Sequence, residues 1–262
     1  MGKAVEAAAA AAGDLRIKAR IERGDLIATG AADAGPSGEG PTRGVPAAAA
    51  IESLETFLSA GDVVVDFSSP EGCRRAAGAS AACGAALVSG TTGLAPGDES
   101  ALEMASRRVP VLRAANFSLG LLALRRALAA ALEALPATWD IEIVERHHRR
   151  KVDSPSGPAL LIAREAARRR GLADSALRFG REGALGPRPA GEIGVHAVRG
   201  GTWVGDHAVL LAGDGEWVEV RHVVEDRASF ALGALAAARF VAHAPPGLYN
   251  LEDVLGPPRR TR

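Results

Sequence analysis

Residues 62–89 read DVVVDFSSPEGCRRAAGASAACGAALVS, and this stretch decides the fold class. The opening run, 62–67, carries consecutive valines, which is typical of a strand buried on both faces of a parallel sheet. Pro70 favours the first turn of a helix, so a helix is predicted over about 70–82. A second apolar strand is predicted over 85–89. Two strands separated by a helix indicate a parallel sheet covered by helices.

The same alternation continues on both sides of this unit. Apolar residues at helical or alternating spacing mark each element. Around the first unit the sequence predicts helices over 2–12, 51–59 and 96–107, strands over 15–21 and 109–113, and a loop rich in Gly, Ala and Pro over 24–46. We therefore expect an α/β fold with a Rossmann-like parallel sheet.

The pattern changes in the second half of the chain. The sequence there predicts helices over 118–134, 158–170 and 228–243, and extended runs over 140–147, 192–199, 202–212 and 216–224. Gly213-Asp214-Gly215 joins the last two runs and favours a hairpin turn. Antiparallel strands after a parallel unit indicate a second α+β domain with a mixed or antiparallel sheet. We expect one domain over 1–117 and 228–262, and another over 118–227.

Composition narrows the class of function. Lys+Arg and Asp+Glu each number 31, and this zero net charge favours neither a nucleic-acid partner nor a membrane surface. The apolar stretches are too short for a membrane span, and no charged-then-apolar leader opens the chain. Cys73 and Cys83 lack the spacing of a disulfide or zinc site. We therefore expect a globular protein of the reducing cytoplasm with no metal.

Three strand ends carry candidate ligand groups, because ligands of open parallel sheets bind at the carboxyl ends of the strands. Glu22 and Arg23 follow the strand at 15–21, where an acid holds a ribose diol and a guanidinium holds a 2′-phosphate. The alternative for this pair is a solvated ion pair. The other sets are Gly90, Thr91, Thr92 and Gly93, whose alternative is a plain turn, and Ala114, Ala115, Asn116 and Phe117, whose alternative is a helix N-cap at Asn116 or Ser118.

The densest reactive segment is ERHHRRKVDSPSGPA, residues 145–159. It holds His147 and His148, and it holds Lys151, one of only three lysines in the chain. Imidazole and ammonium groups are proton donors suited to neutral pH, and the basic charge favours an anionic substrate. On a straight strand His147 and Lys151 would lie about 13 Å apart, so a shared substrate requires a bend between them. The alternative is a basic surface loop.

The sequence resembles the dihydrodipicolinate reductase family of the bacterial diaminopimelate/lysine pathway. The runs that carry the resemblance are VVVDFSSPEG (63–72), SGTTGL (89–94), AANFSLG (114–120), IEIVERHHRRKVDSPSG (141–157) and GEIGVHAVRGGTWVGDH (191–207). The resemblance implies a homotetramer that passes a hydride from NADPH or NADH to a cyclic unsaturated diacid, with His147 as proton donor and acceptor and Lys151 as second proton donor.

The remaining roles are also implied by the resemblance. The substrate dicarboxylate site comprises His148, Ser156, Gly157 and Pro158, at a helix N-terminus that favours anions. Glu22 and Arg23 contact the adenosine ribose and its 2′-phosphate. Gly90, Thr91 and Thr92 form the nicotinamide-side loop, and Ala114, Ala115, Asn116 and Phe117 form the other cofactor wall and a hinge.

Two departures from the family pattern leave alternatives open. The chain begins at the tail of the family's Gly-rich loop, so the first strand and its phosphate loop are expected to be missing between the strands at 15–21 and 62–67. Pro158 stands where the family has Thr, which removes a backbone N–H and a hydroxyl. One alternative is a catalytically impaired or substrate-altered homologue that acts as an oligomeric binding protein. Another is a related Rossmann oxidoreductase with a different anionic substrate.

Overall fold

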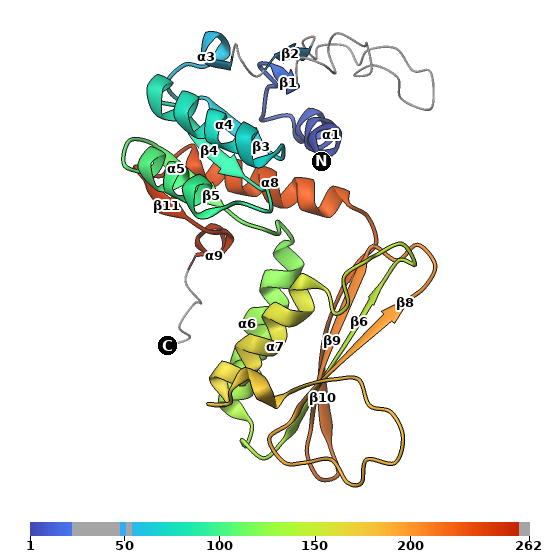
Figure 1. The fold of residues 1–262 in the computed structure, drawn as a ribbon. Helices are drawn as coiled ribbons and strands as arrows, with labels where there is room; N and C mark the ends of the chain where they lie inside the picture. The colour runs from blue at the N-terminus through green and yellow to red at the C-terminus, as the bar shows by residue number, and fades with distance from the viewer. Residues whose placement is uncertain (23–47, 51–53, 257–262) are drawn as a thin grey trace. The chain divides into compact units, whose positions relative to one another are not determined.

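The computed structural model describes residues 1–22, 48–50 and 54–256. The chain divides into two compact units (Figure 1). The first comprises Met1–Phe117 and Ala228–Arg262, and the second comprises Ser118–Arg227. Each unit has its own sheet, and each is described by itself below.

The first unit contains a parallel four-stranded sheet of order β11-β5-β4-β3. Its strands are β3 (Val63–Asp66), β4 (Ala86–Ser89), β5 (Pro110–Arg113) and β11 (Gly247–Tyr249). Its helices are α1 (Gly2–Ala12), α3 (Leu54–Phe57), α4 (Pro70–Cys83), α5 (Pro96–Ser106), α8 (Ala228–Val241) and α9 (Leu251–Val254). The Rossmann-like parallel sheet that the sequence predicts is confirmed.

The β3-α4-β4 unit shows why this stretch folds as the sequence predicts. The side chain of Ser69 caps α4 by accepting a hydrogen bond from the backbone N–H of Gly72 at 3.2 Å. The helix ends at Gly84, whose φ of 73° is the left-handed conformation that suits glycine. Every residue of β4 is buried, as expected for a central parallel strand.

The N-terminal strand differs from its prediction. Strand β1 covers Arg20–Glu22 rather than 15–21, and it pairs in parallel with β2 (Ala48–Ala50) as a separate two-stranded sheet. Within the described residues β3 pairs only with β4, so β3 is an edge strand of the four-stranded sheet. The loop predicted over 24–46 lies outside the described residues, and the helix predicted over 51–59 is described only as α3.

The second unit contains a mixed five-stranded sheet of order β10-β9-β6-β8-β7. Its strands are β6 (Asp140–His147), β7 (Leu177–Phe179), β8 (Ile193–Arg199), β9 (Gly205–Ala212) and β10 (Trp217–Val224), and its helices are α6 (Leu119–Ala134), α7 (Gly157–Arg169) and the short 3-10 helix η2 (Asp174–Ala176). Strand β6 is antiparallel to β9 and parallel to β8, which confirms the mixed sheet. The predicted hairpin closes with a 3.0 Å hydrogen bond from the Gly213 N–H to the Glu216 carbonyl.

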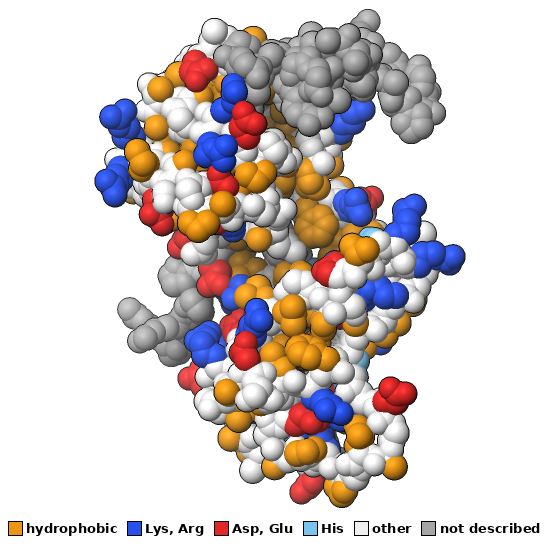
Figure 2. All heavy atoms as spheres, in the orientation of Figure 1, with side chains coloured by type: hydrophobic (Ala, Val, Ile, Leu, Met, Phe, Trp, Pro, Cys, Tyr) orange, Lys and Arg blue, Asp and Glu red, His pale blue; other side chains and the backbone are white. Residues whose placement is uncertain are grey.

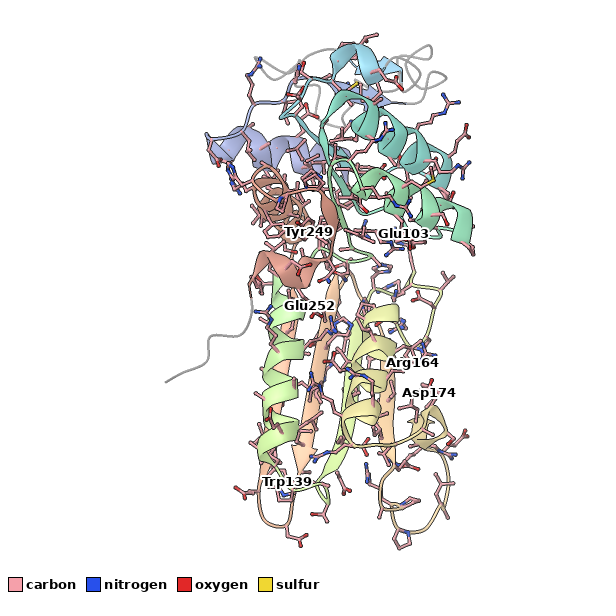
Figure 3. The ribbon with its side chains drawn as sticks, turned by 90° about the vertical axis from the view of Figure 1, so that its left-hand side faces the viewer. Glu103, Trp139, Arg164, Asp174, Tyr249 and Glu252 are labelled. Atoms are coloured by element: carbon pink, nitrogen blue, oxygen red, sulfur yellow. The ribbon has the colours of Figure 1, made fainter. Side chains whose placement is uncertain are left out.

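Alternation along β6 connects the core of this unit to its reactive segment. Every second side chain from Ile141 to His147 is buried, and the residues between are only partly buried. Ile141 and Ile143 pack in a core with Leu128 of α6 and Ile162 of α7. Figure 3 shows α6 and α7 beside the sheet, with Arg164 of α7 near Asp174 of η2 in a 3.1 Å ion pair. Because strand side chains alternate, the core face of β6 continues into Glu145 and His147.

Within the described residues, no helix combines the length and the apolar character needed to cross a membrane. The same residues contain no group of three His, Cys, Asp or Glu side chains placed to hold a metal ion. Figure 2 shows acidic and basic side chains interspersed on the visible face of each unit, as the balanced composition leads one to expect.

Candidate active site

The reactive segment turns sharply where β6 ends. The carbonyl of His147 accepts a 3.0 Å hydrogen bond from the Gly200 N–H, which is the last link of the strand to the chain after β8. The N–H of Lys151 then donates to the carbonyl of His148 at 3.0 Å. This tight turn supplies the bend between His147 and Lys151 that a shared substrate requires. The cause is local, because the pairing of β6 with β8 ends at this point.

Glu145 is a fully buried carboxylate at the centre of the segment. Both oxygens accept a hydrogen bond from the Arg199 guanidinium at 2.7 Å, and Oε1 also accepts from the Ser156 N–H at 3.0 Å. Oε2 lies 2.6 Å from Nδ1 of His147. Burial opposes ionisation, but the hydrogen bonds of His147 and Arg199 outweigh it and lower the pKa of Glu145 to about 2. The carboxylate is therefore ionised at neutral pH.

His147 is buried, with one ring nitrogen held by a carboxylate and the other without a hydrogen-bond partner among the described residues. Glu145 holds Nδ1. Nε2 faces Gly205 of β9, where an added Cβ would lie 3.3 Å from this nitrogen. The imidazole also packs edge-on against His207, with ring centroids 5.2 Å apart. The glycine thus leaves Nε2 room for a small ligand atom.

His207 connects the sheet to the start of α7. Its Nε2 lies 3.2 Å from the hydroxyl of Ser156, and this hydroxyl also caps the helix by accepting from the Ala159 N–H at 3.2 Å. Burial, followed by the charge of His147, lowers the pKa of His207 to about 4. His207 is therefore a neutral imidazole at pH 7.

Lys151 lies on the turn, with its ammonium 2.7 Å from Oδ1 of Asp153. The hydrogen bond from Lys151 lowers the pKa of Asp153. Asp153 is exposed, whereas the lysine side chain is only 19% exposed. His148, at the head of the same turn, is partly buried, and its Nδ1 has no hydrogen-bond partner within the described residues. The turn therefore carries an ammonium and an imidazole between the end of β6 and the start of α7 in the chain.

The N-terminus of α7 offers fewer donors than a helix start usually does. Ser156 is the N-cap, Gly157 is the first helical residue and Pro158 the second. The Ser156 side chain is buried and already bonded, and Pro158 has no N–H. The exposed Gly157 N–H is the donor that remains for an anion, and the helix dipole supports it.

A second buried carboxylate lies on the other face of the same sheet. Asp206 accepts hydrogen bonds from Arg146 at 2.9 Å and from Arg221 at 3.0 and 2.7 Å. Burial works against ionisation, but these guanidinium groups lower its pKa. Arg146 is therefore held away from the face that carries His147, which follows from its alternate position in β6.

A buried carboxylate at the end of β3 holds the loop that follows β4. Asp66, at the end of β3, is buried and accepts 2.8 Å hydrogen bonds from the hydroxyls of Ser89 and Thr91. Thr91 is 4% exposed and its side chain anchors the loop, whereas Thr92 next to it is exposed. A Cβ on Gly90 would lie 2.1 Å from the Phe67 ring, so this loop position requires glycine.

The remaining predicted cofactor residues divide by exposure. Phe117 is 2% exposed and packs edge-on against Phe67 with ring centroids 5.3 Å apart. Both rings lie against Gly90, so the Phe117 side chain supports the loop that begins there. Ala115 is exposed, and Ala114 and Asn116 are partly buried. Glu22 ends β1. Arg23 lies outside the described residues.

In the second unit, Ser118 caps α6 by accepting a hydrogen bond from the Leu121 N–H. The helix N-cap that the sequence offered as an alternative for this segment is therefore found at Ser118.

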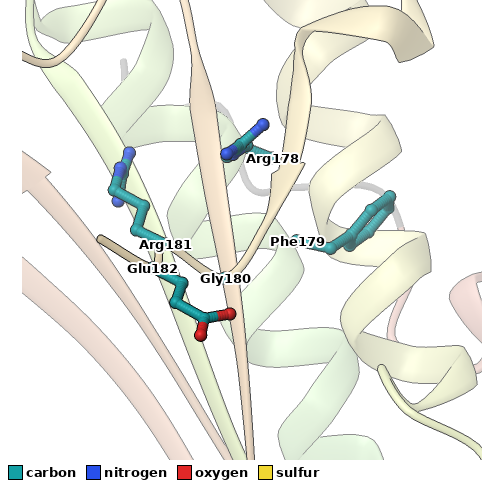
Figure 4. A pocket seen from close by; sticks show the side chains of 5 residues that line it. All are labelled: Arg178, Phe179, Gly180, Arg181 and Glu182. Carbon is teal, nitrogen blue, oxygen red and sulfur yellow. The ribbon is translucent and has the colours of Figure 1, made fainter. Parts of the chain in front are cut away.

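These strand ends fit a nicotinamide dinucleotide. Strands β3, β4 and β5 are parallel neighbours, so their carboxyl ends meet at one edge of the sheet, where such cofactors bind. Glycine at position 90, followed closely by the exposed residues Thr92 and Gly93, allows close approach of a ligand. By contrast, the shallow hollow in Figure 4, lined by Arg178, Phe179, Gly180, Arg181 and Glu182, contains no predicted site residue.

Sequence reasoning missed the groups that hold His147 in place. The sequence pattern assigned no role to Glu145, Arg199, Gly205 or His207. One signal was present, since Glu145 and His147 are two residues apart in a predicted strand and so share a face. Arg199 lies 54 residues from Glu145 in the sequence, so only pairing of β6 with β8 brings them together.

Comparisons with known proteins agree over almost the whole chain. The family model "Dihydrodipicolinate reductase, N-terminus" matches residues 1–117, and "Dihydrodipicolinate reductase, C-terminus" matches residues 120–255. The 4-hydroxy-tetrahydrodipicolinate reductase of Caulobacter vibrioides is 41% identical over 260 residues, covering 98% of this chain and 93% of that protein. The enzyme of the same name from Sinorhizobium fredii is 45% identical over 249 residues, covering 94% and 89%.

A solved structure supports the fold independently. The dipicolinate-bound dihydrodipicolinate reductase from Paenisporosarcina sp. TG-14 superposes with a TM-score of 0.74 at 23% identity, covering 95% of this chain and 92% of that one. Both halves of the chain match the corresponding halves of one family, and the curated relatives share the match over nearly their full length. The chain therefore belongs to the dihydrodipicolinate reductase family.

Proposed function

We propose that this protein is an NAD(P)H-dependent oxidoreductase that reduces 4-hydroxy-tetrahydrodipicolinate to tetrahydrodipicolinate in diaminopimelate/lysine biosynthesis. Family membership supports the reaction class. The observation that carries the proposal is the environment of His147, an imidazole anchored at Nδ1 by a buried carboxylate while Nε2 has no hydrogen-bond partner within the described residues. Such a group exchanges protons with a bound substrate at neutral pH.

The second unit supplies the groups for a small dianion. His147 and Lys151 are proposed as proton donors, and His148 and the start of α7 as the dicarboxylate site. The Gly157 N–H and the dipole of α7 favour a carboxylate there, as do the cations on the adjacent turn. The dipicolinate in the Paenisporosarcina protein is a small dicarboxylate, which supports this class of substrate.

The first unit supplies the cofactor groups. Glu22 and Arg23 are proposed to hold the adenosine ribose and a 2′-phosphate. The loop of Gly90, Thr91 and Thr92 and the segment of Ala114, Ala115, Asn116 and Phe117 are proposed to line the nicotinamide side. When bound, reduced nicotinamide supplies a hydride. Asp66 holds the loop in position through the Thr91 hydroxyl.

The deciding experiment is a turnover assay. The purified chain is mixed with NADPH or NADH and the cyclic hydroxy-diacid, and the loss of reduced nicotinamide absorbance is followed. We expect substrate-dependent oxidation of the nicotinamide. Binding of the diacid without turnover would favour the alternative of an impaired homologue that acts as a binding protein, and turnover of a different anion would favour the substrate-altered alternative.

Two further properties belong to the same proposal. The family resemblance and the sheet of the second unit support a homotetramer, and light scattering on the purified protein measures the mass directly. The composition supports a cytoplasmic location, because no disulfide holds Cys73 or Cys83. A fluorescent fusion expressed in the native host tests the location.

A further inference from the structure

We propose that Glu145, held by Arg199, is the positioning residue of His147 and fixes the imidazole in the tautomer that carries hydrogen on Nδ1 and presents Nε2 to the substrate. The inference rests on the reductase function proposed above, since it concerns the residue to which that function gives the proton. It goes beyond that proposal by assigning the tautomer of His147 to Glu145 and the charge of Glu145 to Arg199.

The contact between Glu145 and His147 decides which of the two residues carries the shared hydrogen. An ionised carboxylate accepts hydrogen bonds and donates none. Glu145 is ionised, and its Oε2 lies 2.6 Å from Nδ1 of His147. The hydrogen between these atoms must therefore lie on Nδ1. In the neutral imidazole Nε2 then has the free lone pair, and in the imidazolium Nε2 carries the transferable proton.

Nε2 of His147 has surroundings quite different from those of Nδ1. Within the described residues this nitrogen has no hydrogen-bond partner, and it faces the one position of β9 that lacks a side chain, Gly205. The ring beside it, His207, is neutral at pH 7 and therefore does not repel a proton on His147. Glu145 thus fixes one nitrogen while the neighbouring strand leaves the other accessible.

Glu145 keeps its charge although it is buried. An isolated buried carboxylate would take up a proton, and Arg199 prevents this by donating to both oxygens. The same guanidinium donates to the carbonyl of Asp153 at 2.8 Å. Asp153 is on the turn that carries Lys151, so the ion pair orders the segments of both proposed proton donors.

The chain contains a matched control for this arrangement. Glu142 lies three residues earlier in β6, and hydrogen bonds from Arg181, His196 and Arg188 also lower its pKa to about 2 against the effect of burial. Its Oε2 lies 2.7 Å from Nε2 of His196. Glu142 is on the opposite face of the strand and does not touch His147. The two glutamates therefore share strand, charge and partner types and differ in the histidine they contact.

The test compares Glu145→Gln, Glu145→Asp and Glu142→Gln in the full-length protein. In Glu145→Gln the amide oxygen can remain with the Ser156 N–H and one guanidinium nitrogen of Arg199. The amide nitrogen then takes the place of Oε2, where it faces Nδ1 of His147 and the other guanidinium nitrogen, and it favours hydrogen on Nε2. We expect kcat to fall by about tenfold or more, as for other residues that orient a functional imidazole, with KM and the NADPH Kd changed less than about twofold. Glu145→Asp should recover part of kcat, and Glu142→Gln should keep it.

A tautomer measurement makes the test independent of turnover. Side-chain ¹⁵N NMR on histidine-labelled protein reports which nitrogen of each neutral ring carries hydrogen, and a His147→Gln sample assigns the signal. We expect hydrogen on Nδ1 of His147 in the wild type and in Glu142→Gln, and on Nε2 in Glu145→Gln. Should Glu145→Gln fail to fold, the wild-type and Glu145→Asp spectra still decide the point.

Three results would overturn the inference: hydrogen on Nε2 of His147 in the neutral wild-type ring, an unchanged kcat in Glu145→Gln, or equal losses of kcat in Glu145→Gln and Glu142→Gln. Failure of the proposed function looks different. In that case the wild-type protein shows no turnover of the diacid, while the NMR tautomer still supports or rejects the role of Glu145.

Discussion

Glu142 and Glu145 lie three residues apart in β6, point to opposite faces of one sheet, and each accept hydrogen bonds from a histidine and from arginine. Only Glu145 is completely buried, and only its histidine lies in the reactive segment. The two carboxylates therefore have different structural roles. Glu142 links β6 and β8 to the segment that follows β7 through its hydrogen bonds, and Glu145 orders the candidate site. A variant at the candidate site can therefore be compared with a control variant elsewhere in the fold.

His147→Ala and Lys151→Ala should each reduce turnover by roughly 10²–10⁴-fold, the usual contribution of general acid–base catalysis. NADPH binding should be nearly unchanged, because both residues belong to the second unit. Steady-state kinetics and fluorescence titration of NADPH measure the two effects. Suitable controls are His196→Ala, which removes the histidine beside Glu142, and Lys18→Ala, which removes a lysine paired with Asp62. A site variant that keeps more than about half of the turnover does not fit the assigned role.

Gly205→Ala should lower kcat by about tenfold with the fold retained. The new Cβ would lie 3.3 Å from Nε2 of His147, which crowds the atom that meets the substrate. Gly97→Ala is the matched control, because a Cβ at Gly97 meets nothing within 4 Å. Kinetics together with far-UV circular dichroism test the pair. Equal kcat in the two variants would place the substrate on another side of the imidazole.

His207 should make the second unit sensitive to mild acid. Burial lowers the pKa of His207 to about 4 from an ordinary value of 6.5. Between these values the unfolded chain binds a proton that the folded chain excludes, so stability is full above pH 6.5 and falls as the pH drops towards 4. Linkage sets the loss at up to about 3 kcal/mol.

Denaturant unfolding followed by tryptophan fluorescence measures this loss, because Trp139, Trp203 and Trp217 all lie in the second unit. His207→Gln should flatten the dependence of the unfolding free energy between pH 6.5 and 4. The exposed His243 provides the control His243→Gln, which should leave the slope as in the wild type. An unchanged slope in His207→Gln would mean that this ring does not exclude the proton.

Pro158→Thr should lower KM for the cyclic diacid by about tenfold, since a charge-assisted hydrogen bond contributes about 1.5–3 kcal/mol. Threonine returns an N–H and a hydroxyl at the second position of α7, next to the Gly157 N–H. Pro96→Thr, at the first turn of α5 in the other unit, controls for the loss of a helix-starting proline. An equal or higher KM in Pro158→Thr would show that Arg149 or Arg150 already compensates, or that the substrate is another anion.

Arg23→Ala should weaken NADPH binding much more than NADH binding. Only NADPH carries the 2′-phosphate that a guanidinium holds by paired hydrogen bonds. Calorimetric titration of both cofactors measures the difference, and Arg75→Ala on α4 serves as the surface control. Comparable losses for NADPH and NADH would identify Arg23 as a general surface charge.

Much of the fold follows from local sequence pattern. The valine run of β3, the proline that starts α4 and the hairpin between β9 and β10 all depend on neighbouring residues, and each is found where the sequence predicts it. The short elements β7, β11 and α9 were missed, because three or four residues carry too little periodicity to be recognised. Strand β1 was misplaced, since alternation over 15–21 continues beyond the residues that find a pairing partner.

By itself the sequence determined the parallel strand–helix alternation, the change to a mixed sheet, and the segment that carries His147 and Lys151. The tertiary structure alone decided the state of those groups. Arg199 lies 54 residues from Glu145, and Ser156 lies beyond the turn that follows β6. Their hydrogen bonds to Glu145, of 2.7–3.0 Å, exist only because β6, β8 and α7 pack together. Ionisation of a buried carboxylate and the tautomer of the histidine beside it depend on such short distances and on exclusion of water, which no run of residues encodes locally.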